Sequence, residues 1–203
     1  MSDNKRYVRS IPTQFTTRED GDKPTIEGYF AVFNSNYEID RGMSESIAPG
    51  AFSGALTRDI RALVNHDTTL VLGRNKAGTL ELREDEHGLW GSVEVNPNDR
   101  AAMDLYERVK RGDVDQCSFG FSTYEQDTDV RENGDVHWTL TRVDLDEVSC
   151  CTFPAYDATS ISARAAERDD IQKRRREAWK ENMLKRLKGE KDGTQSTHAP
   201  EED

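Results

Sequence analysis

Short runs in which apolar and polar residues alternate predict β-strands along most of the first three quarters of the chain. The alternation is clearest at residues 78–85 and 87–96, and the polar turn between them predicts that these two strands pair. β-Branched and aromatic residues mark two more strands, at 7–15 and 25–33. The polar stretch between those two, residues 16–24, is typical of a turn.

Four further segments predict strands in the second half of this region, at 60–66, 70–74, 116–126 and 136–153. The last is so long that it must bend or break somewhere. The Asn-Gly pair at 133–134 is a strong hairpin signal and predicts that the last two strands are neighbours. The body is therefore strand-rich and, with the helices described next, belongs to the α+β class.

Residues 97–112 predict the clearest helix of the body. Asn98 or Asp99 can cap its first turn, and Gly112 can end it. Spacings of three and four residues place four side chains on one face, which should pack on the core: Ala102, Leu105, Tyr106 and Val109.

Three other regions complete the coarse assignment. Residues 34–50 have few side chains of the buried type and are predicted to form a loop, and residues 51–56 can start a short helix. Residues 164–188 form a helical pattern with few large apolar side chains.

Charge divides the chain in the same way as the predicted elements. Residues 1–163 carry a net charge of −12, residues 164–191 carry +5, and the last 12 residues carry −4. We therefore expect a body at 1–163, a charged helical arm at 164–188 with a separate task, and a disordered tail at 189–203.

Composition limits the class of protein. Of 203 residues, 34% are hydrophobic and 33% are charged, which suits a modest core with polar extensions. The sequence has no apolar run near the roughly 20 residues that cross a bilayer, so no membrane association is expected. Its three cysteines have no CxxC spacing, and neither disulfides, zinc nor another cofactor is expected in a reducing cytoplasm.

The stretch QCSFGF at 116–121 holds two possible nucleophiles, Cys117 and Ser118. In an ideal strand Cys117 shares a face with two phenylalanines, whereas Ser118 shares the other face with Gly120 and Ser122. The apolar face should turn Cys117 into the core. The small residues should leave Ser118 exposed, with room for a ligand backbone.

Two other positions could serve such a nucleophile. His66 ends the apolar run 60–66, which would hold its ring rigidly at a strand exit, as a general base requires. The stretch DLDEVS at 144–149 offers carboxylates that could orient an imidazole. The pair His66–Asp67 alone is poor evidence for a metal-dependent hydrolase.

The basic run 173–176 could contact nucleic acid. Glu177 and Glu181 follow it, however, and suit a solvated or partner-binding helix equally well. No specific nucleic-acid binding is therefore expected.

Eight segments follow one another along residues 7–163 in an order that carries a further signal: GYFAVFN at 28–34, IAPGAF at 47–52, NHD at 65–67, LGR at 72–74, GTLEL…HGLW at 78–90, ERVKRGDVDQCSFGF at 107–121, EVS at 147–149 and PAYDAT at 154–159. In this order they resemble the prohead, or capsid maturation, serine proteases of tailed phages, which are distantly related to the herpesvirus assemblins. The resemblance implies a mostly antiparallel, β-barrel-like core with flanking helices, as in assemblins.

The same resemblance implies a serine endopeptidase with Ser118 as nucleophile and His66 as general base. Glu147 matches the third position, and Asp146 is the alternative. The implied substrates are the scaffold domain of the major capsid protein, other internal proteins and the protease itself, cleaved inside the procapsid after assembly in the host cytoplasm. A homodimer is implied by analogy with assemblins. The main rival is a non-enzymatic internal scaffold or packaging protein that keeps the fold.

Overall fold

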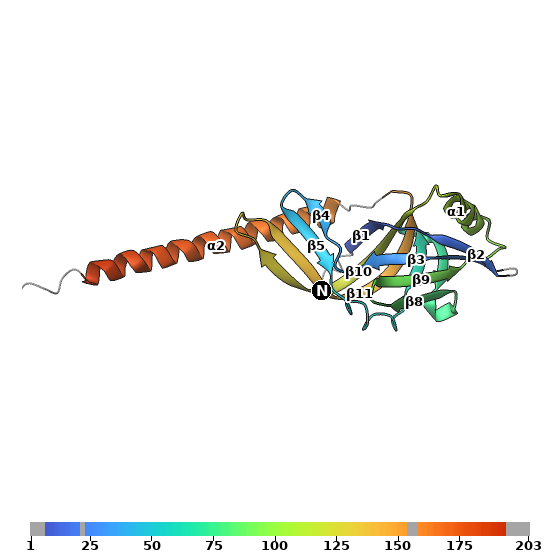
Figure 1. Cartoon of the computed structure of the whole chain (residues 1–203), viewed down its shortest axis with the longest axis horizontal. Coiled ribbons are helices and arrows are strands. Elements are labelled where there is room, and N and C mark those ends of the chain that lie inside the picture. Colours follow the sequence, from blue (N-terminus) through green and yellow to red (C-terminus); the bar gives the residue numbers. More distant parts are fainter. Residues whose placement is uncertain (1–6, 21–22, 154–157, 194–203) are drawn as a thin grey trace, which may run out of the picture. The chain divides into compact units, whose positions relative to one another are not determined.

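The computed structural model describes residues 7–20, 23–153 and 158–193 (Figure 1). By their contacts the residues form two compact units, Met1–Ser162 and Ala163–Asp203, which are described separately. The predicted tail at 189–203 lies outside the described residues from position 194 onward.

The larger sheet of the first unit is built around two long strands, β10 and β11. Its order is β1-β10-β11-β5-β4, and β11 also pairs with β6, which pairs with β7. The strands are β1 (Tyr7–Pro12), β4 (Tyr37–Asp40), β5 (Met43–Ile47), β6 (Arg61–Val64), β7 (Asp67–Arg74), β10 (Gln116–Val130) and β11 (Val136–Cys151). The edge of β11 that faces away from β10 is thus shared by β5 near its start and β6 near its end.

The smaller sheet has the order β2-β3-β9-β8, and all of its pairings are antiparallel. Its strands are β2 (Thr16–Asp20), β3 (Lys23–Val32), β8 (Leu80–Glu84) and β9 (Gly88–Glu94). Apolar side chains of both sheets meet in one core, where Phe52 packs edge-on against Phe119 and is stacked with Phe33.

The predicted α+β, strand-rich class is confirmed. Among the described strands, seven of the nine pairings are antiparallel, and the two parallel ones both involve β11. The described strands do not form a closed ring, because the order of the larger sheet runs from β1 at one edge to β4 at the other.

The larger sheet is nevertheless strongly curled. The guanidinium of Arg9 on β1 forms a bidentate ion pair with Glu45 on β5, although β10 and β11 lie between those strands in the sheet. Glu45 is completely buried, so the pair crosses the interior. Three irregularities in the β10–β11 ladder, between Gly120 and Gln126, provide the bend that the length of β11 required.

Helix α1 (Arg100–Arg111) is capped as the sequence predicts. Asp99 accepts hydrogen bonds from two first-turn amides, and Gly112 ends the helix with a φ of 86°. The four residues predicted to face the core are its buried ones: Ala102, Leu105, Tyr106 and Val109.

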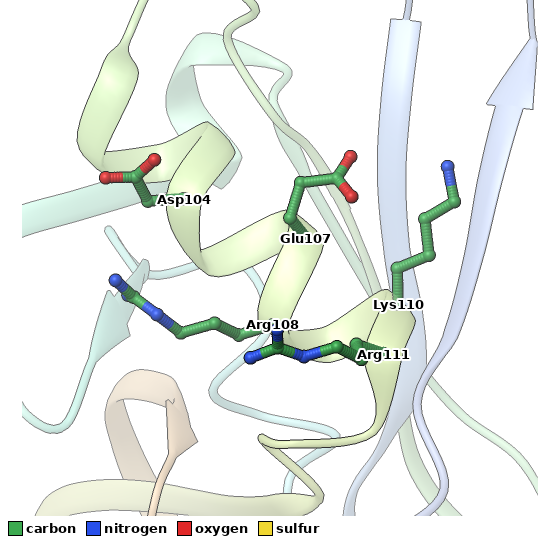
Figure 2. Close-up of a pocket in the computed structure, with 5 residues that line it drawn as sticks. All are labelled: Asp104, Glu107, Arg108, Lys110 and Arg111. Carbon is green, nitrogen blue, oxygen red and sulfur yellow. The ribbon is translucent and has the colours of Figure 1, made fainter.

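The outward face of α1 borders a surface depression lined by charged side chains (Figure 2): Asp104, Glu107, Arg108, Lys110 and Arg111. Lys110 also forms an ion pair with Glu19 of β2, at 3.0 Å. This depression contains none of the candidate catalytic residues.

Helix α2 (Ala158–Gly193) belongs mostly to the second unit and extends beyond the predicted range at both ends. Ion pairs one turn apart join Asp170 to Arg174 and Glu181 to Lys185 on its surface. In the part of the chain that the structure describes, no helix combines the length and the apolar character that crossing a membrane requires.

Three local assignments were wrong. Residues 16–20 form strand β2 and not a turn, because pairing with β3 outweighs their polar composition. Residues 34–50 contain β4 and β5, and the alternation of buried and half-buried residues in β5 is too short to stand out in the sequence. Residues 51–56 form a series of turns and not a helix.

Candidate active site

His66 lies in the tight turn that joins β6 to β7. Val64 pairs with Asp67, so Asn65 and His66 form a two-residue hairpin loop. Their φ angles are 50° and 62°, and such positive values at both central positions are those of a type I′ turn. Asparagine and histidine tolerate this left-handed conformation better than most residues. The turn fixes the backbone of His66 at the end of a buried strand.

The turn is attached to the end of β11 by backbone and side-chain contacts. The Asn65 amide donates to the Cys150 carbonyl at 3.0 Å, and the Thr152 amide donates to the Asn65 side-chain oxygen at 2.9 Å. The amide of His66 donates to Ser149 Oγ at 3.3 Å. These bonds hold the imidazole against the strand that carries Glu147.

The structure brings His66 and Glu147 together. Nδ1 of the ring lies 2.6 Å from Glu147 Oε1, and both side chains are largely shielded from water. An ionised carboxylate can only accept, so Nδ1 carries the hydrogen and Nε2 is left as the basic nitrogen. The second oxygen of Glu147, Oε2, accepts from Ser149 Oγ at 2.6 Å.

Asp146, the alternative carboxylate, has other partners. It accepts from Ser122 Oγ at 3.3 Å and lies 3.7 Å from Arg58, which also pairs with Asp144. Successive side chains of a strand point to opposite faces, so Asp146 faces away from the imidazole that Glu147 contacts.

Ser118 lies on β10, directly opposite Ser149 on β11 and Ser10 on β1. Because β10 and β6 flank β11, Ser118 and His66 approach Ser149 from opposite sides. The Ser118 hydroxyl donates to the Arg9 carbonyl at 2.8 Å. Ser118 and His66 are both among the described residues, and they are not hydrogen-bonded to each other.

The expectation that Ser118 is exposed was wrong, because the residue has no solvent-accessible surface. Small side chains on one face of a strand are therefore not enough to keep that face open to solvent. The expectation for Cys117 is confirmed: it is fully buried in the core, and its thiol contacts the Tyr29 carbonyl.

Cys151 also lies near the imidazole, and the sequence did not identify it as a site residue. Sγ of Cys151 lies 3.7 Å from His66 Nε2. Burial, and to a lesser extent the negative charge of Glu147, raise the pKa of the Cys151 thiol to about 12. The group is therefore a neutral thiol at physiological pH and not a reactive thiolate.

Ser149 and Asn65 were also missed as site residues, although both occur in the segments that carry the family resemblance. Their roles depend on strands distant in sequence, and no local pattern reports them. Within the described ranges, no cluster of three or more His, Cys, Asp or Glu side chains could hold a metal ion.

The chain is similar in sequence to known proteins, and part of its fold matches one solved structure. The family model of the Caudovirus prohead serine protease matches residues 12–174. The prohead protease of Enterobacteria phage HK97 is 34% identical over 155 residues, which span 74% of this chain but only 64% of that protein. The match to the solved structure of the bacteriophage T4 capsid assembly protease, gp21, covers 74% of this chain and 98% of that one. The sequence identity is 11%, and the TM-score is 0.49. The family match over most of its length shows that the chain belongs to the Caudovirus prohead serine proteases.

Proposed function

We propose that this protein is a serine endopeptidase in which Ser118 is the nucleophile, His66 the general base and Glu147 the residue that orients the base. The observation that carries the proposal is the 2.6 Å contact between His66 Nδ1 and Glu147 Oε1, one strand away from Ser118. Membership in a serine protease family supports the same assignment.

In the first half of the reaction, Ser118 Oγ attacks the carbonyl carbon of the scissile peptide bond while His66 Nε2 takes the hydroxyl proton. Glu147 stabilises the imidazolium through the hydrogen bond at Nδ1. The tetrahedral intermediate then collapses, and the imidazolium gives its proton to the leaving amine. The acyl group remains on Ser118 Oγ.

In the second half, His66 Nε2 takes a proton from a water molecule that attacks the acyl carbon. Collapse of this second intermediate breaks the bond to Ser118 Oγ, and the proton on His66 returns to the serine. Backbone amides near Ser118 would stabilise the oxyanion in both halves.

Two contacts of the described conformation must change before the first step. The Ser118 hydroxyl has to turn from the Arg9 carbonyl toward His66, and the Cys151 thiol has to leave Nε2. Because Ser118 is also fully buried, the described arrangement is a closed one that opens when substrate binds.

We further propose that the substrates are the scaffold domain of the major capsid protein, other internal proteins and the protease itself. Cleavage would occur inside the procapsid, which assembles in the host cytoplasm. Helix α2, with its basic run at 173–176, would serve as an arm that recruits the protease during assembly, and the protein would act as a homodimer.

A second function has two observations in its favour. The burial of Ser118 and its bond to Arg9 also suit an internal scaffold or packaging protein that no longer cleaves. The retained pair of His66 and Glu147 argues against that alternative, because a scaffold has no need of an oriented imidazole.

Co-expression with the major capsid protein of the same phage distinguishes the two functions. The peptidase predicts a shortened capsid protein with the wild-type chain and an intact one with Ser118→Ala. Ser122→Ala, on the same strand, is the matched control and should leave cleavage unchanged. Capsid protein that stays intact with the wild-type chain, or is still cut with Ser118→Ala, would contradict the proposal.

A further inference from the structure

We infer that Ser149 is a positioning residue of the active site, which holds both the carboxylate of Glu147 and the backbone of His66. This inference rests on the proposed function, and it adds a fourth side chain to the three that the sequence singles out. The hydroxyl of Ser149 contacts Glu147 and the His66 amide, and we assign it a role that acts through these two partners.

The hydrogen bonds of Ser149 close a ring. Its hydroxyl donates to Glu147 Oε2 at 2.6 Å and accepts from the His66 amide at 3.3 Å. The ring is completed by Glu147 Oε1 and His66 Nδ1, at 2.6 Å. Each oxygen of the carboxylate therefore has its own partner, and the carboxylate cannot rotate without losing one of them.

The buried surroundings of Ser149 strengthen these hydrogen bonds. Ser149 has no exposed surface, and Glu147 is almost completely buried. Hydrogen bonds to a charged group shielded from water are stronger than those between neutral groups. The amide that donates to Ser149 belongs to His66, which has a φ of 62°. The same hydroxyl therefore also supports the strained turn.

Removing the hydroxyl should change the chemistry of the pair as well as its position. Without a donor at Oε2, the carboxylate holds the proton of the imidazolium more strongly. The imidazolium form of His66 is therefore stabilised relative to the neutral form. Because the reaction needs neutral His66, the acid limb of the activity profile should move to higher pH.

The reactivity of Ser118 as a function of pH can be measured with a fluorophosphonate probe, without knowledge of the natural substrate. Ser118 Oγ attacks the phosphorus, fluoride leaves, and the hydroxyl proton passes to His66, so the rate of labelling reports the base. The rate is measured from pH 5 to 9 on the full chain, with the folded state checked by thermal unfolding. The variants are Ser149→Ala, Ser149→Cys and Ser149→Thr.

Ser149→Ala should label at least about tenfold more slowly at neutral pH, which corresponds to one hydrogen bond to a charged group. Its acid limb should lie at higher pH than that of the wild type. Ser149→Cys, which fills the space with a weaker donor, should shift the limb in the same direction. Ser149→Thr, which keeps a hydroxyl, should recover most of the rate.

The matched control is Ser92→Ala. Ser92 also donates to a glutamate, Glu27, at 3.2 Å, but in the smaller sheet. It should label at the wild-type rate with an unchanged acid limb.

The outcomes separate this inference from the proposed function. A folded Ser149→Ala or Ser149→Cys protein with the wild-type rate and acid limb would overturn the inference, while labelling that disappears in Ser118→Ala would leave the proposed function standing. A wild-type chain that is never labelled at Ser118 contradicts the proposed function, and the positioning role with it.

Discussion

Nδ1 of His66 and Oε1 of Glu147 are 2.6 Å apart, although 81 positions separate the two residues in the sequence. The contact exists because β6 pairs with β11 in parallel, which places the turn after β6 over the end of β11. Glu147 and Asp146 are adjacent in sequence, but Glu147 contacts His66 and Ser149, whereas Asp146 contacts Ser122 and Arg58. That difference predicts which carboxylate the reaction needs.

Glu147→Gln keeps the size of the side chain but removes its charge. The amide can present its nitrogen to Nδ1, which favours the wrong tautomer of His66, and it cannot stabilise the imidazolium. We expect labelling by a fluorophosphonate to slow by about 10³–10⁴-fold, as for the corresponding change in other triads. Asp146→Asn is the matched control and should change the rate less than about threefold, because its partners are Arg58 and Ser122. The reverse order of effects would assign the third role to Asp146.

The type I′ turn predicts a stability difference between two changes at Asn65. Both Asn65→Gly and Asn65→Val lose the hydrogen bond from the Thr152 amide. Only valine, a β-branched residue, is strained at a φ of 50°. Urea titration should therefore show Asn65→Val to be less stable than Asn65→Gly by about 2 kcal/mol. Equal stabilities would mean that this turn does not hold its positive φ in solution.

The buried ion pair of Arg9 and Glu45 predicts a large loss of stability when one partner is neutralised. Glu45→Gln leaves the guanidinium of Arg9 without its counter-charge in the interior, and we expect a loss of about 3–5 kcal/mol in the free energy of unfolding. Glu125→Gln breaks an exposed pair with Arg142 and should cost less than about 1 kcal/mol. A small effect at Glu45 would contradict the curled arrangement that joins β1 to β5.

The raised pKa of Cys151 predicts an alkaline loss of stability. The thiol has a pKa near 9.0 in the unfolded chain and about 12 in the folded protein. Between these values the unfolded state releases a proton that the folded state keeps, so the free energy of unfolding falls as pH rises. The slope is about 1.4 kcal/mol per pH unit for one such group. Between pH 8 and 10, urea titrations should therefore show a smaller decrease for Cys151→Ala than for the wild type, by about this amount. Parallel decreases would mean that the thiol is not shielded in solution.

The elements that the sequence predicted correctly are those whose signals are local. Helix α1 has its cap at Asp99, its apolar spacing and its final Gly112 within one short segment. Strand β5 was missed because its burial depends on pairing with β11, which lies about 90 residues further along the chain. Polar strand β2 was missed for a similar reason, since pairing with β3 defines it.

The candidate site shows the same division. The alternation along QCSFGF correctly placed Cys117 in the core, because the face of a strand is a local property. It could not predict that Ser118 is buried, since the alternation within one strand does not report which distant parts of the chain cover a face. The contacts of Ser149 and Cys151 with His66 likewise follow from the meeting of β6 and β11.

Mass spectrometry of the fluorophosphonate-treated chain shows which side chain is the nucleophile. We expect one phosphonyl group, carried by Ser118, that is absent when His66 is replaced by alanine. A phosphonyl group on Ser149 or another serine, or labelling that does not depend on His66, would contradict this expectation.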